Sequence, residues 1–263
     1  MKKLLLDLDG TMYHGTRRIE SAVQFLNELN QRGIDYLFLT NNAARTQTQA
    51  ANHMSMMGYE KIEPMQFYTS AMAAVDYAAS HYTQRRAFVI GEEGIREALI
   101  QNGFEIVTEN ADFVFVGLDR NAYYKDYSLA IRQILNGAIL IGTNDDRILP
   151  SEEGANVGNG SIVHMMEYCT QTQSLKIGKP SSVILEGALK YTGWKKEDVL
   201  IVGDNLETDI LCGIHSKIQT SLVLTGLSHR KDIEKTVIVP DLVAEDLLEL
   251  LHILEQLDNK EGM

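Results

Sequence analysis

Short runs of apolar residues alternate along the chain with stretches in which apolar residues recur every three or four positions. Leu4–Leu8 and Tyr36–Leu39 are continuous apolar runs, which is typical of strands buried on both faces. Between them, Val23, Leu26 and Leu29 stand at helical spacing. This order of strand, helix and strand predicts a parallel sheet covered by helices.

The same alternation continues to the end of the chain. Helices are predicted at Arg45–Met57, Ser70–His81, Gly94–Gln101, Tyr123–Leu135, Ser161–Tyr168, Ser181–Tyr191, Asn205–Gly213 and Glu245–Leu257. Further strands are predicted at Ala87–Ile90, Phe113–Val116, Ala138–Ile141, Val199–Val202 and Thr220–Leu224. Acid-rich strand ends stand near both ends of the chain, and the middle holds only one weaker candidate, Asp145-Asp146. This asymmetry suggests a core built from both ends, with the middle inserted.

Two aspartates follow the first apolar run, in Asp7-Leu8-Asp9-Gly10-Thr11. In a parallel sheet, ligands bind outside the carboxyl ends of the strands, and alternation along a strand sends Asp7 and Asp9 to the same side. Two carboxylates this close repel each other unless a cation lies between them, and Mg²⁺ prefers hard oxygen ligands. The alternative is a simple Asp-Gly turn, which the position after a buried run disfavours.

A second acidic segment, Gly203-Asp204-Asn205-Leu206-Glu207-Thr208-Asp209, follows another apolar run. We expect Asp204 to complete a metal site with Asp7 and Asp9, and Asp209 to support that site from the following helix. The alternative is that Asp204 or Asn205 acts only as a helix N-cap, a position these residue types favour.

Two further segments carry groups suited to an anion. Thr40-Asn41-Asn42 ends the second strand, where a hydroxyl, an amide and backbone N–H groups form an oxyanion site. A helix cap is an equally good interpretation. Lys179 stands between Gly178 and Pro180, and a proline suits the first turn of a helix, so Lys179 is expected beside a helix start. The alternative for this lysine is an ordinary solvated charge.

In this order, the four segments resemble the four motifs of the haloacid dehalogenase (HAD) superfamily of phosphohydrolases, and the similarity extends over the whole chain. Tyr68-Thr69-Ser70-Ala71 and the segment from Val202 to Ile210 are similar to the NagD-like branch. That branch includes nucleotidases and aryl-phosphate, phosphoglycolate and pyridoxal-phosphate phosphatases. The resemblance implies a Rossmann-like, doubly wound catalytic core at 1–81 and 176–263. An α/β cap domain would be inserted at 82–175.

The resemblance also implies a mechanism. Asp7 would attack phosphorus and form an aspartyl-phosphate, as carboxylate nucleophiles can. Asp9 would protonate the leaving oxygen and then deprotonate the hydrolytic water. Mg²⁺ would bind the carboxylates of Asp7 and Asp204 and, by family analogy, the backbone carbonyl of Asp9.

The remaining roles concern phosphate binding and support. Thr40, Asn41 and Lys179 would hold the transferring oxygens. Asp209 would orient the metal site from outside it, and Asn205 would assist either this support or phosphate binding. Thr143-Asn144-Asp145-Asp146 is similar to the family's cap loop, and Gly154–Gly160 suggests a flexible substrate loop. Ordinary turns are the alternative for both segments.

Composition narrows the choice of partners. The 263 residues include 36 acidic and 24 basic ones, a net charge of −12, which disfavours a nucleic-acid polymer. No stretch approaches the ~20 apolar residues of a membrane span. Cys169 and Cys212 have no metal-ligand spacing and are expected as free thiols. We therefore expect a cytoplasmic enzyme for a small phosphorylated metabolite, and a homodimer is compatible with the resemblance.

Four other functions agree less well with these residues. Asp9 disfavours hydrolytic dehalogenation, which needs no second aspartate paired to a metal. The strand-rich insert disfavours a phosphomutase, whose cap is typically smaller and helical, and no cap lysine suggests phosphonate cleavage. A non-catalytic phosphate-binding protein on the same fold is the remaining alternative, and the presence of both Asp7 and Asp9 argues against it.

Overall fold

The computed structural model describes residues 2–151 and 154–261. They form an α/β fold of parallel sheets with flanking helices, which confirms the predicted fold class. The chain divides into two compact units, which are described separately. Unit 1 comprises Met1–Leu39, Ala51–Phe67 and Ala188–Met263, and unit 2 comprises Thr40–Ala50 and Tyr68–Gly187. Among the described residues, no helix has both the length and the apolarity that crossing a membrane requires.

A six-stranded sheet has the order β15-β14-β13-β1-β4-β5. Its strands are β1 Lys3–Leu6, β4 Tyr36–Thr40, β5 Phe67–Thr69, β13 Val199–Gly203, β14 Gln219–Val223 and β15 Leu242–Ala244. Neighbours from β15 through β4 pair in parallel. The apolar runs of β1 and β13 are continuous because they are buried on both faces, with Leu4, Leu5 and Leu6 fully buried.

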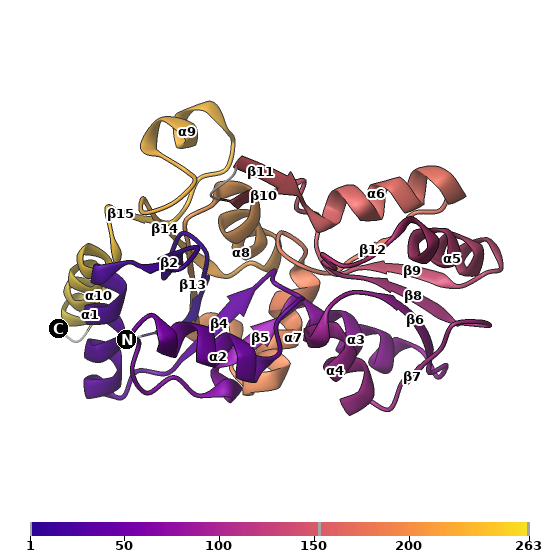
Figure 1. Ribbon diagram of the computed structural model, residues 1–263. Helices are drawn as coiled ribbons and strands as arrows, with labels where there is room; N and C mark the ends of the chain where they lie inside the picture. Colours follow the sequence, from indigo (N-terminus) through magenta and orange to yellow (C-terminus); the bar gives the residue numbers. More distant parts are fainter. Residues whose placement is uncertain (1, 152–153, 262–263) are drawn as a thin grey trace. The chain divides into compact units, whose positions relative to one another are not determined.

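Helices connect these strands along the chain. They are α1 Glu20–Arg32, α2 Gln47–Met56, α7 Ser182–Thr192, α8 Leu211–Ser216, α9 Arg230–Lys235 and α10 Leu247–Glu261, with the short 3-10 helices η1 Pro64–Gln66 and η2 Lys196–Asp198 and the π-helix η3 Leu206–Ile210. α1 and α10 lie side by side (Figure 1). α1 ends at Gly33, whose φ of 64° is a left-handed conformation that glycine adopts without steric cost.

A five-stranded sheet has the order β12-β9-β8-β6-β7, and all its pairs are parallel. Its strands and helices are β6 Arg86–Ile90, β7 Glu105–Ile106, β8 Phe113–Val116, β9 Ile139–Gly142, β12 Leu175–Lys176, α3 Ser70–His81, α4 Glu93–Gln101, α5 Tyr124–Leu135 and α6 Asn159–Thr170. α5 and α6 lie along one face of this sheet and α3 and α4 along the other (Figure 1). Alternate strand residues, such as Phe88 and Ile90, pack into the core under α5 and α6.

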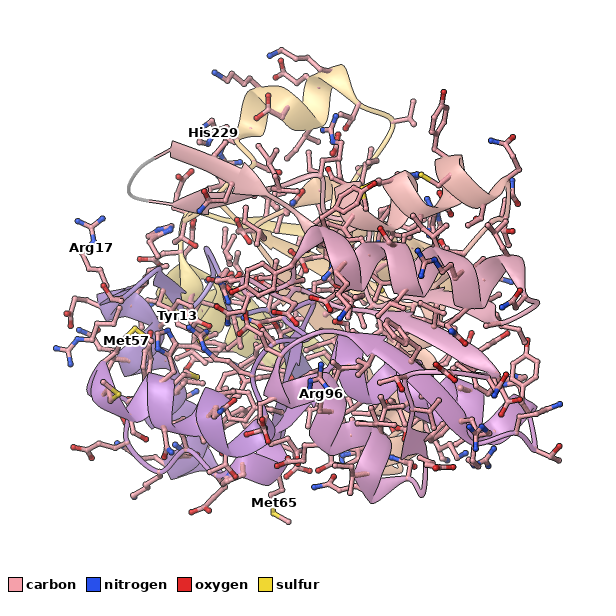
Figure 2. All side chains as sticks on the ribbon, turned by 45° about the vertical axis from the view of Figure 1, so that its right-hand side comes forward. Tyr13, Arg17, Met57, Met65, Arg96 and His229 are labelled. Atoms are coloured by element: carbon pink, nitrogen blue, oxygen red, sulfur yellow. The ribbon has the colours of Figure 1, made fainter. Side chains whose placement is uncertain are left out.

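Two antiparallel hairpins complete the described structure, β2 Tyr13–His14 with β3 Arg17–Arg18 and β10 Ile148–Ser151 with β11 Gly154–Val157. The first follows the predicted catalytic loop: Tyr13 is 2% exposed, whereas Arg17 extends outward (Figure 2). The second corrects the prediction of a substrate loop at Gly154–Gly160. That segment forms strand β11 and the start of α6, because its backbone pairs with the strand before it.

Other predicted elements differ mainly at their ends, and strands of two or three residues were missed because they are too short to show a period. The helix start predicted at Asn205–Gly213 is present, as the π-helix η3 that continues directly into α8. The placement of Pro180 in the first turn of a helix is wrong. α7 begins at Ser182, and a turn precedes it in which the Ser181 N–H donates to the Gly178 carbonyl at 2.9 Å.

Candidate active site

Asp7 follows β1 and Asp204 follows β13, and these are neighbouring parallel strands. The register places Leu6 beside Val202, and the Asp7 N–H donates to the Val202 carbonyl oxygen at 2.9 Å. Both aspartates are buried, with 8% of Asp7 and 1% of Asp204 exposed. Two carboxylates therefore lie at the carboxyl edge of the sheet, where ligands bind in open α/β folds.

Asp209 joins them from η3. One carboxylate oxygen from each of Asp7, Asp204 and Asp209 lies within 4.8 Å of the others. The Asn205 N–H donates to Asp209 Oδ2 at 3.2 Å, which ties this carboxylate to the strand end that carries Asp204. The sequence predicts that Asp209 supports the site from outside, whereas in the structure one of its carboxylate oxygens belongs to the same 4.8 Å group as those of Asp7 and Asp204. We call these three residues the acid cluster.

A loop after β14 contacts Asp204 of the acid cluster. Asp204 Oδ2 accepts the Leu227 N–H at 2.7 Å. Gly226 and Gly10 both approach this carboxylate so closely that neither position has room for a Cβ. The Thr225 hydroxyl donates to the Gly10 carbonyl at 2.7 Å, so the same loop also holds the segment after Asp7. Sequence reasoning missed this loop, and its only signal was a Thr-Gly pair shortly after a strand.

Asp9 lies outside the acid cluster and is exposed to solvent. β1 ends at Leu6, so the alternation invoked for Asp7 and Asp9 does not extend along a strand. The chain turns instead, with the Met12 N–H donating to the Leu8 carbonyl at 2.7 Å. Gly10 makes this turn at a φ of 89°, a conformation that favours glycine. The exposed carboxylate can exchange protons with solvent.

The donor set of the acid cluster fits a hard divalent cation. Three buried carboxylates close together repel one another, and a bound cation removes that repulsion. All the donors are carboxylate oxygens, which Mg²⁺ prefers, whereas softer metals favour thiolate or imidazole ligands. Other groups of three metal-ligating side chains are absent from the ranges that the structure describes. The cluster is therefore the candidate metal centre.

Thr40, the last residue of β4, begins a loop whose polar side chains hold one another. The Thr40 hydroxyl is buried and accepts the Asn42 N–H at 3.1 Å. Asn42 Oδ1 in turn accepts the N–H of Ala44 at 3.0 Å. The residue that caps α2 is Thr46, which exchanges hydrogen bonds with Gln49 at 3.0 and 3.1 Å. The cap interpretation therefore applies to Thr46, and Thr40 lies well before the helix.

Asn41 and Lys179 are in direct contact within unit 2. Asn41 Oδ1 accepts the Lys179 N–H at 2.8 Å, and Asn41 Nδ2 donates to the Lys179 carbonyl at 3.0 Å. Lys179 is only 3% exposed, so it is not an ordinary solvated lysine. A buried ammonium in a turn has restricted freedom, which suits binding of a defined anion.

Asn205 has a local structural role. Its side-chain Oδ1 accepts the Glu207 N–H at 2.9 Å, so Asn205 caps η3. This is the helix-cap interpretation that the sequence left open. Asn205 directly follows Asp204 in the sequence, and its side chain is half-buried. Both observations agree with a residue that supports the acid cluster.

The predicted cap loop is built into unit 2 by charged and amide groups. Asp145 pairs with Lys176 at 2.9 Å and with His164 at 2.9 Å. His164 also pairs with Glu167 at 2.7 Å. The neighbouring Asn144 donates to the Asn41 carbonyl at 2.8 Å. The loop is thereby fixed on one side by the ion pair of Asp145 with Lys176 and on the other by the hydrogen bond to Asn41.

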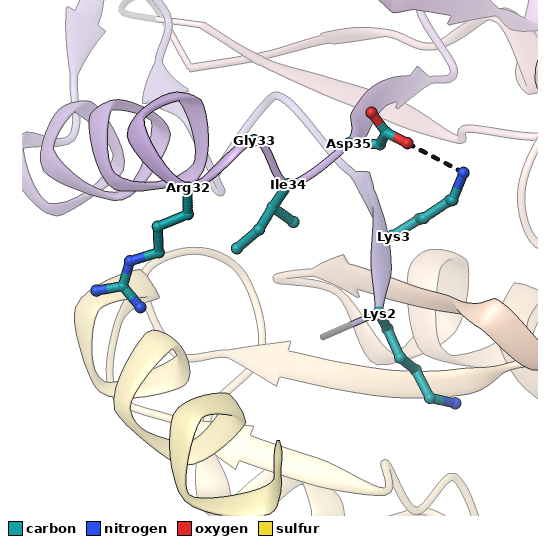
Figure 3. A pocket seen from close by; sticks show the side chains of 6 residues that line it. All are labelled: Lys2, Lys3, Arg32, Gly33, Ile34 and Asp35. Carbon is teal, nitrogen blue, oxygen red and sulfur yellow. Dashed lines mark ion pairs between the residues drawn. The ribbon is translucent and has the colours of Figure 1, made fainter. Parts of the chain in front are cut away.

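A shallow hollow in unit 1 carries a different set of groups (Figure 3). Lys3 at the start of β1 pairs with Asp35 at 3.0 Å, and Arg32 at the end of α1 pairs with Glu28 at 3.0 Å. Lys2 also lines this hollow. It lies at the amino ends of β1 and β4, away from the edge that carries the acid cluster, and ion pairs occupy Lys3 and Arg32. We assign it no ligand.

Comparison with known proteins gives the family. Residues 4–105 match the family model of haloacid dehalogenase-like hydrolases, and residues 176–250 match a second, HAD-hydrolase-like model. The 5′-nucleotidase YutF of Bacillus subtilis (strain 168) is 42% identical over 248 residues, covering 93% of this chain and 96% of that protein. The chain belongs to the haloacid dehalogenase-like hydrolases. The two matching ranges contain Asp7 and Lys179, respectively.

Further relatives place this hydrolase in the NagD-like branch. An acid sugar phosphatase of Staphylococcus epidermidis (strain ATCC 12228) is 38% identical over 244 residues, covering 92% of this chain and 94% of that protein. The structure of NagD from E. coli K-12 superposes with a TM-score of 0.88 at 32% identity, covering 95% of this chain and 98% of that one. This HAD hydrolase is therefore a NagD-like phosphoric monoester hydrolase, which confirms the family predicted from its motifs.

Proposed function

We propose that this HAD hydrolase is a Mg²⁺-dependent phosphatase that cleaves small phosphomonoesters through an aspartyl-phosphate on Asp7. The observation that carries the proposal is the acid cluster, three buried carboxylates gathered at the carboxyl edge of a parallel sheet. Three buried carboxylates this close destabilise the fold unless a cation binds between them, so such a cluster indicates a functional site. Its placement at a strand end agrees with catalysis rather than with support of the fold.

The reaction has two steps. An oxygen of Asp7 attacks phosphorus while the bond from phosphorus to the leaving oxygen breaks, and Asp9 donates its proton to that oxygen. Asp9, now ionised, takes a proton from a water molecule that attacks the same phosphorus. Inorganic phosphate leaves, and Asp7 returns to a carboxylate. The exposed position of Asp9 suits proton exchange, and the buried position of Asp7 limits its freedom before attack.

Mg²⁺ would be held by the carboxylates of Asp7 and Asp204 and the backbone carbonyl of Asp9, with Asp209 supporting it. When bound, this ion would offset the charge of the phosphoryl group and of the attacking carboxylate. Without a cation, the acid cluster would repel an anionic substrate, and the net charge of −12 would add to that repulsion.

Thr40 and Lys179 would bind the transferring phosphoryl oxygens. A hydroxyl and an ammonium both donate hydrogen bonds to phosphate, and burial strengthens the attraction between Lys179 and the anion. We further propose that residues 82–175 act as a cap that selects the substrate. Its class is a small phosphomonoester, such as a nucleoside monophosphate, a sugar phosphate, phosphoglycolate or an aryl phosphate.

Phosphate release from an aryl phosphate tests the proposal. Wild type and Asp7→Asn are compared with Mg²⁺ and with EDTA, and a rapid acid quench followed by mass spectrometry looks for a phosphoryl group on Asp7. We expect release to require both Mg²⁺ and Asp7, because an amide is a poor nucleophile. Asp35→Asn is the matched control, since this exposed aspartate lies in the hollow near Lys3. It should keep wild-type activity.

The competing function is a phosphate-binding protein that does not turn over its ligand. This competing function would be supported if wild type binds Mg²⁺ and phosphate but releases no phosphate from a panel of small phosphomonoesters. Full activity of Asp7→Asn would instead show that another group is the nucleophile. Activity that survives EDTA would remove the metal from the proposal.

A further inference from the structure

The side-chain amide of Asn41 is fully engaged. Its Oδ1 accepts the Lys179 N–H at 2.8 Å, and its Nδ2 donates to the Lys179 carbonyl at 3.0 Å. Nδ2 also donates to Asp146 Oδ1 at 3.2 Å. A primary amide has two N–H donors, so these bonds with Lys179 and Asp146 use both of them.

The phosphoryl group of a dianionic phosphomonoester offers only acceptor oxygens to a neighbouring amide and therefore needs free donors. The side-chain amide of Asn41 has no N–H left for it without giving up Lys179 or Asp146. The bonds to Lys179, in contrast, form a two-point contact that holds both the N–H and the carbonyl of that residue. Lys179 lies before the start of α7, so helical hydrogen bonds do not fix its main chain. The two bonds to Asn41 fix it instead.

Asn41 is itself fixed by two other segments. Its carbonyl oxygen accepts the Ser70 hydroxyl at 2.7 Å and the Asn144 Nδ2 at 2.8 Å. Ser70 is fully buried and Asn144 is 7% exposed, so these bonds are shielded from water. The contact between Asn41 and Lys179 therefore rests on a rigid frame.

Gly178, the residue before Lys179, leaves room for the contact between Asn41 and Lys179. An ideal Cβ on Gly178 would lie 2.6 Å from Asn41 Oδ1 and 2.6 Å from the Thr143 carbonyl oxygen. The Gly178 N–H donates to that same carbonyl at 2.9 Å. A side chain at this position would push Asn41 away, so the glycine is what lets the amide reach Lys179.

We propose that Asn41 is a positioning residue, which places the ammonium of Lys179 by clamping its main chain, and that its side-chain amide does not bind phosphate. Asp146 completes the clamp by holding the second N–H of Nδ2. This inference rests on the proposed function, in which Lys179 binds the transferring phosphoryl group. It refines the expectation that the Asn41 amide contacts the phosphate oxygens itself.

A double-mutant cycle tests the clamp. kcat/KM for an aryl phosphate is measured at saturating Mg²⁺ for wild type, Asn41→Ala, Lys179→Ala and the double variant. We expect Asn41→Ala to lower kcat/KM by about 10- to 100-fold in the wild-type background, because a small displacement of a catalytic group is costly. In the Lys179→Ala background, the same change should alter kcat/KM by less than about 2-fold. If the two losses multiply, Asn41 acts independently of Lys179 and the proposal is overturned.

Asn42→Ala is the control for damage to the loop. Asn42 is the same residue type at the next position, and its Oδ1 accepts local N–H groups, those of Ala44 at 3.0 Å and Arg45 at 3.3 Å. The factor by which Asn42→Ala lowers kcat/KM should be the same in the wild-type and Lys179→Ala backgrounds. A merely structural role of Asn41 would show the same equality, so the contrast between the two asparagines separates positioning from stability.

A second variant and a second readout cover the remaining outcomes. If Asn41→Ala does not fold, Asp146→Ala takes its place, since it frees one N–H of the clamp; its loss should also vanish in the Lys179→Ala background. Affinity for inorganic phosphate, measured by calorimetry with Mg²⁺ on the same proteins, gives the same comparison without turnover. If wild type binds phosphate but hydrolyses no phosphomonoester, the proposed function is wrong and the clamp is not contradicted. A wild type that binds no phosphate overturns the clamp as well.

Discussion

A methyl group on Gly226 tests whether the carboxylate of Asp204 must stay where the loop after β14 holds it. An ideal Cβ there would lie 2.7 Å from the Cβ of Asp204, and closer still to its Oδ2 oxygen. Ordinary Cβ contacts begin at 3.4 Å, so the Asp204 side chain or the loop must move by at least about 0.7 Å. The carboxylate cannot retreat freely, because its Oδ2 accepts the Leu227 N–H at 2.7 Å.

This shift is large on the scale of metal binding. Mg²⁺ holds oxygen ligands at about 2.0–2.1 Å in near-ideal octahedral geometry. Misplacing a reacting group by about 1 Å costs about 100-fold in rate. We therefore expect Gly226→Ala to lower kcat/KM by about 100-fold, close to 3 kcal/mol of transition-state stabilisation. The Mg²⁺ concentration for half-maximal activity should rise as well, because Asp204 is a proposed ligand.

Two assays measure these effects. Phosphate release from an aryl phosphate is titrated with Mg²⁺, and thermal unfolding is followed with and without Mg²⁺, since a bound ion stabilises the folded state. Gly117→Ala is the matched control: Gly117 is buried, and its added Cβ would meet its nearest neighbour at 3.4 Å. Wild-type activity and wild-type Mg²⁺ affinity in Gly226→Ala would refute the argument that this contact sets the position of Asp204.

Three other substitutions have defined outcomes. Asp9→Asn removes the proton donor and should lower kcat by about 10²- to 10⁴-fold without changing the thermal midpoint; activity near wild type would assign the proton transfer elsewhere. Tyr59→Phe removes the buried hydroxyl that donates to the Met12 carbonyl, and urea unfolding should show a loss of about 1–3 kcal/mol. Burial raises the pKa of Glu167, but the hydrogen bonds from Ser174 and the nearby charges of His164 and Lys176 outweigh it, so that pKa lies below its ordinary value. The resulting stabilisation is present at neutral pH and is lost as the pH falls through the lowered pKa. Ser174→Ala should therefore lose less stability on acidification than wild type, by about 1 kcal/mol in urea unfolding; equal losses would contradict this account.

The motifs at the strand ends were predictable because they depend on local order. A continuous apolar run such as Leu4–Leu6 must be buried, so the polar residue that follows it emerges at a strand end. Parallel strands then bring such ends to one edge, which is how Asp7 and Asp204 meet in the acid cluster. The NagD-like family was recognisable from the same short segments.

What each polar group contacts was decided only by the tertiary structure. Asn41 and Lys179 are 138 residues apart, and no local pattern reveals that the amide of one clamps the main chain of the other. Gly226 came close to Asp204 only because β14 pairs with β13, and Asp209 entered the acid cluster because the chain forms a π-helix after Asn205. Period and burial are properties of neighbouring residues, whereas hydrogen-bond partners depend on which distant segments pack together. That choice reflects the balance of core packing against chain entropy over the whole fold.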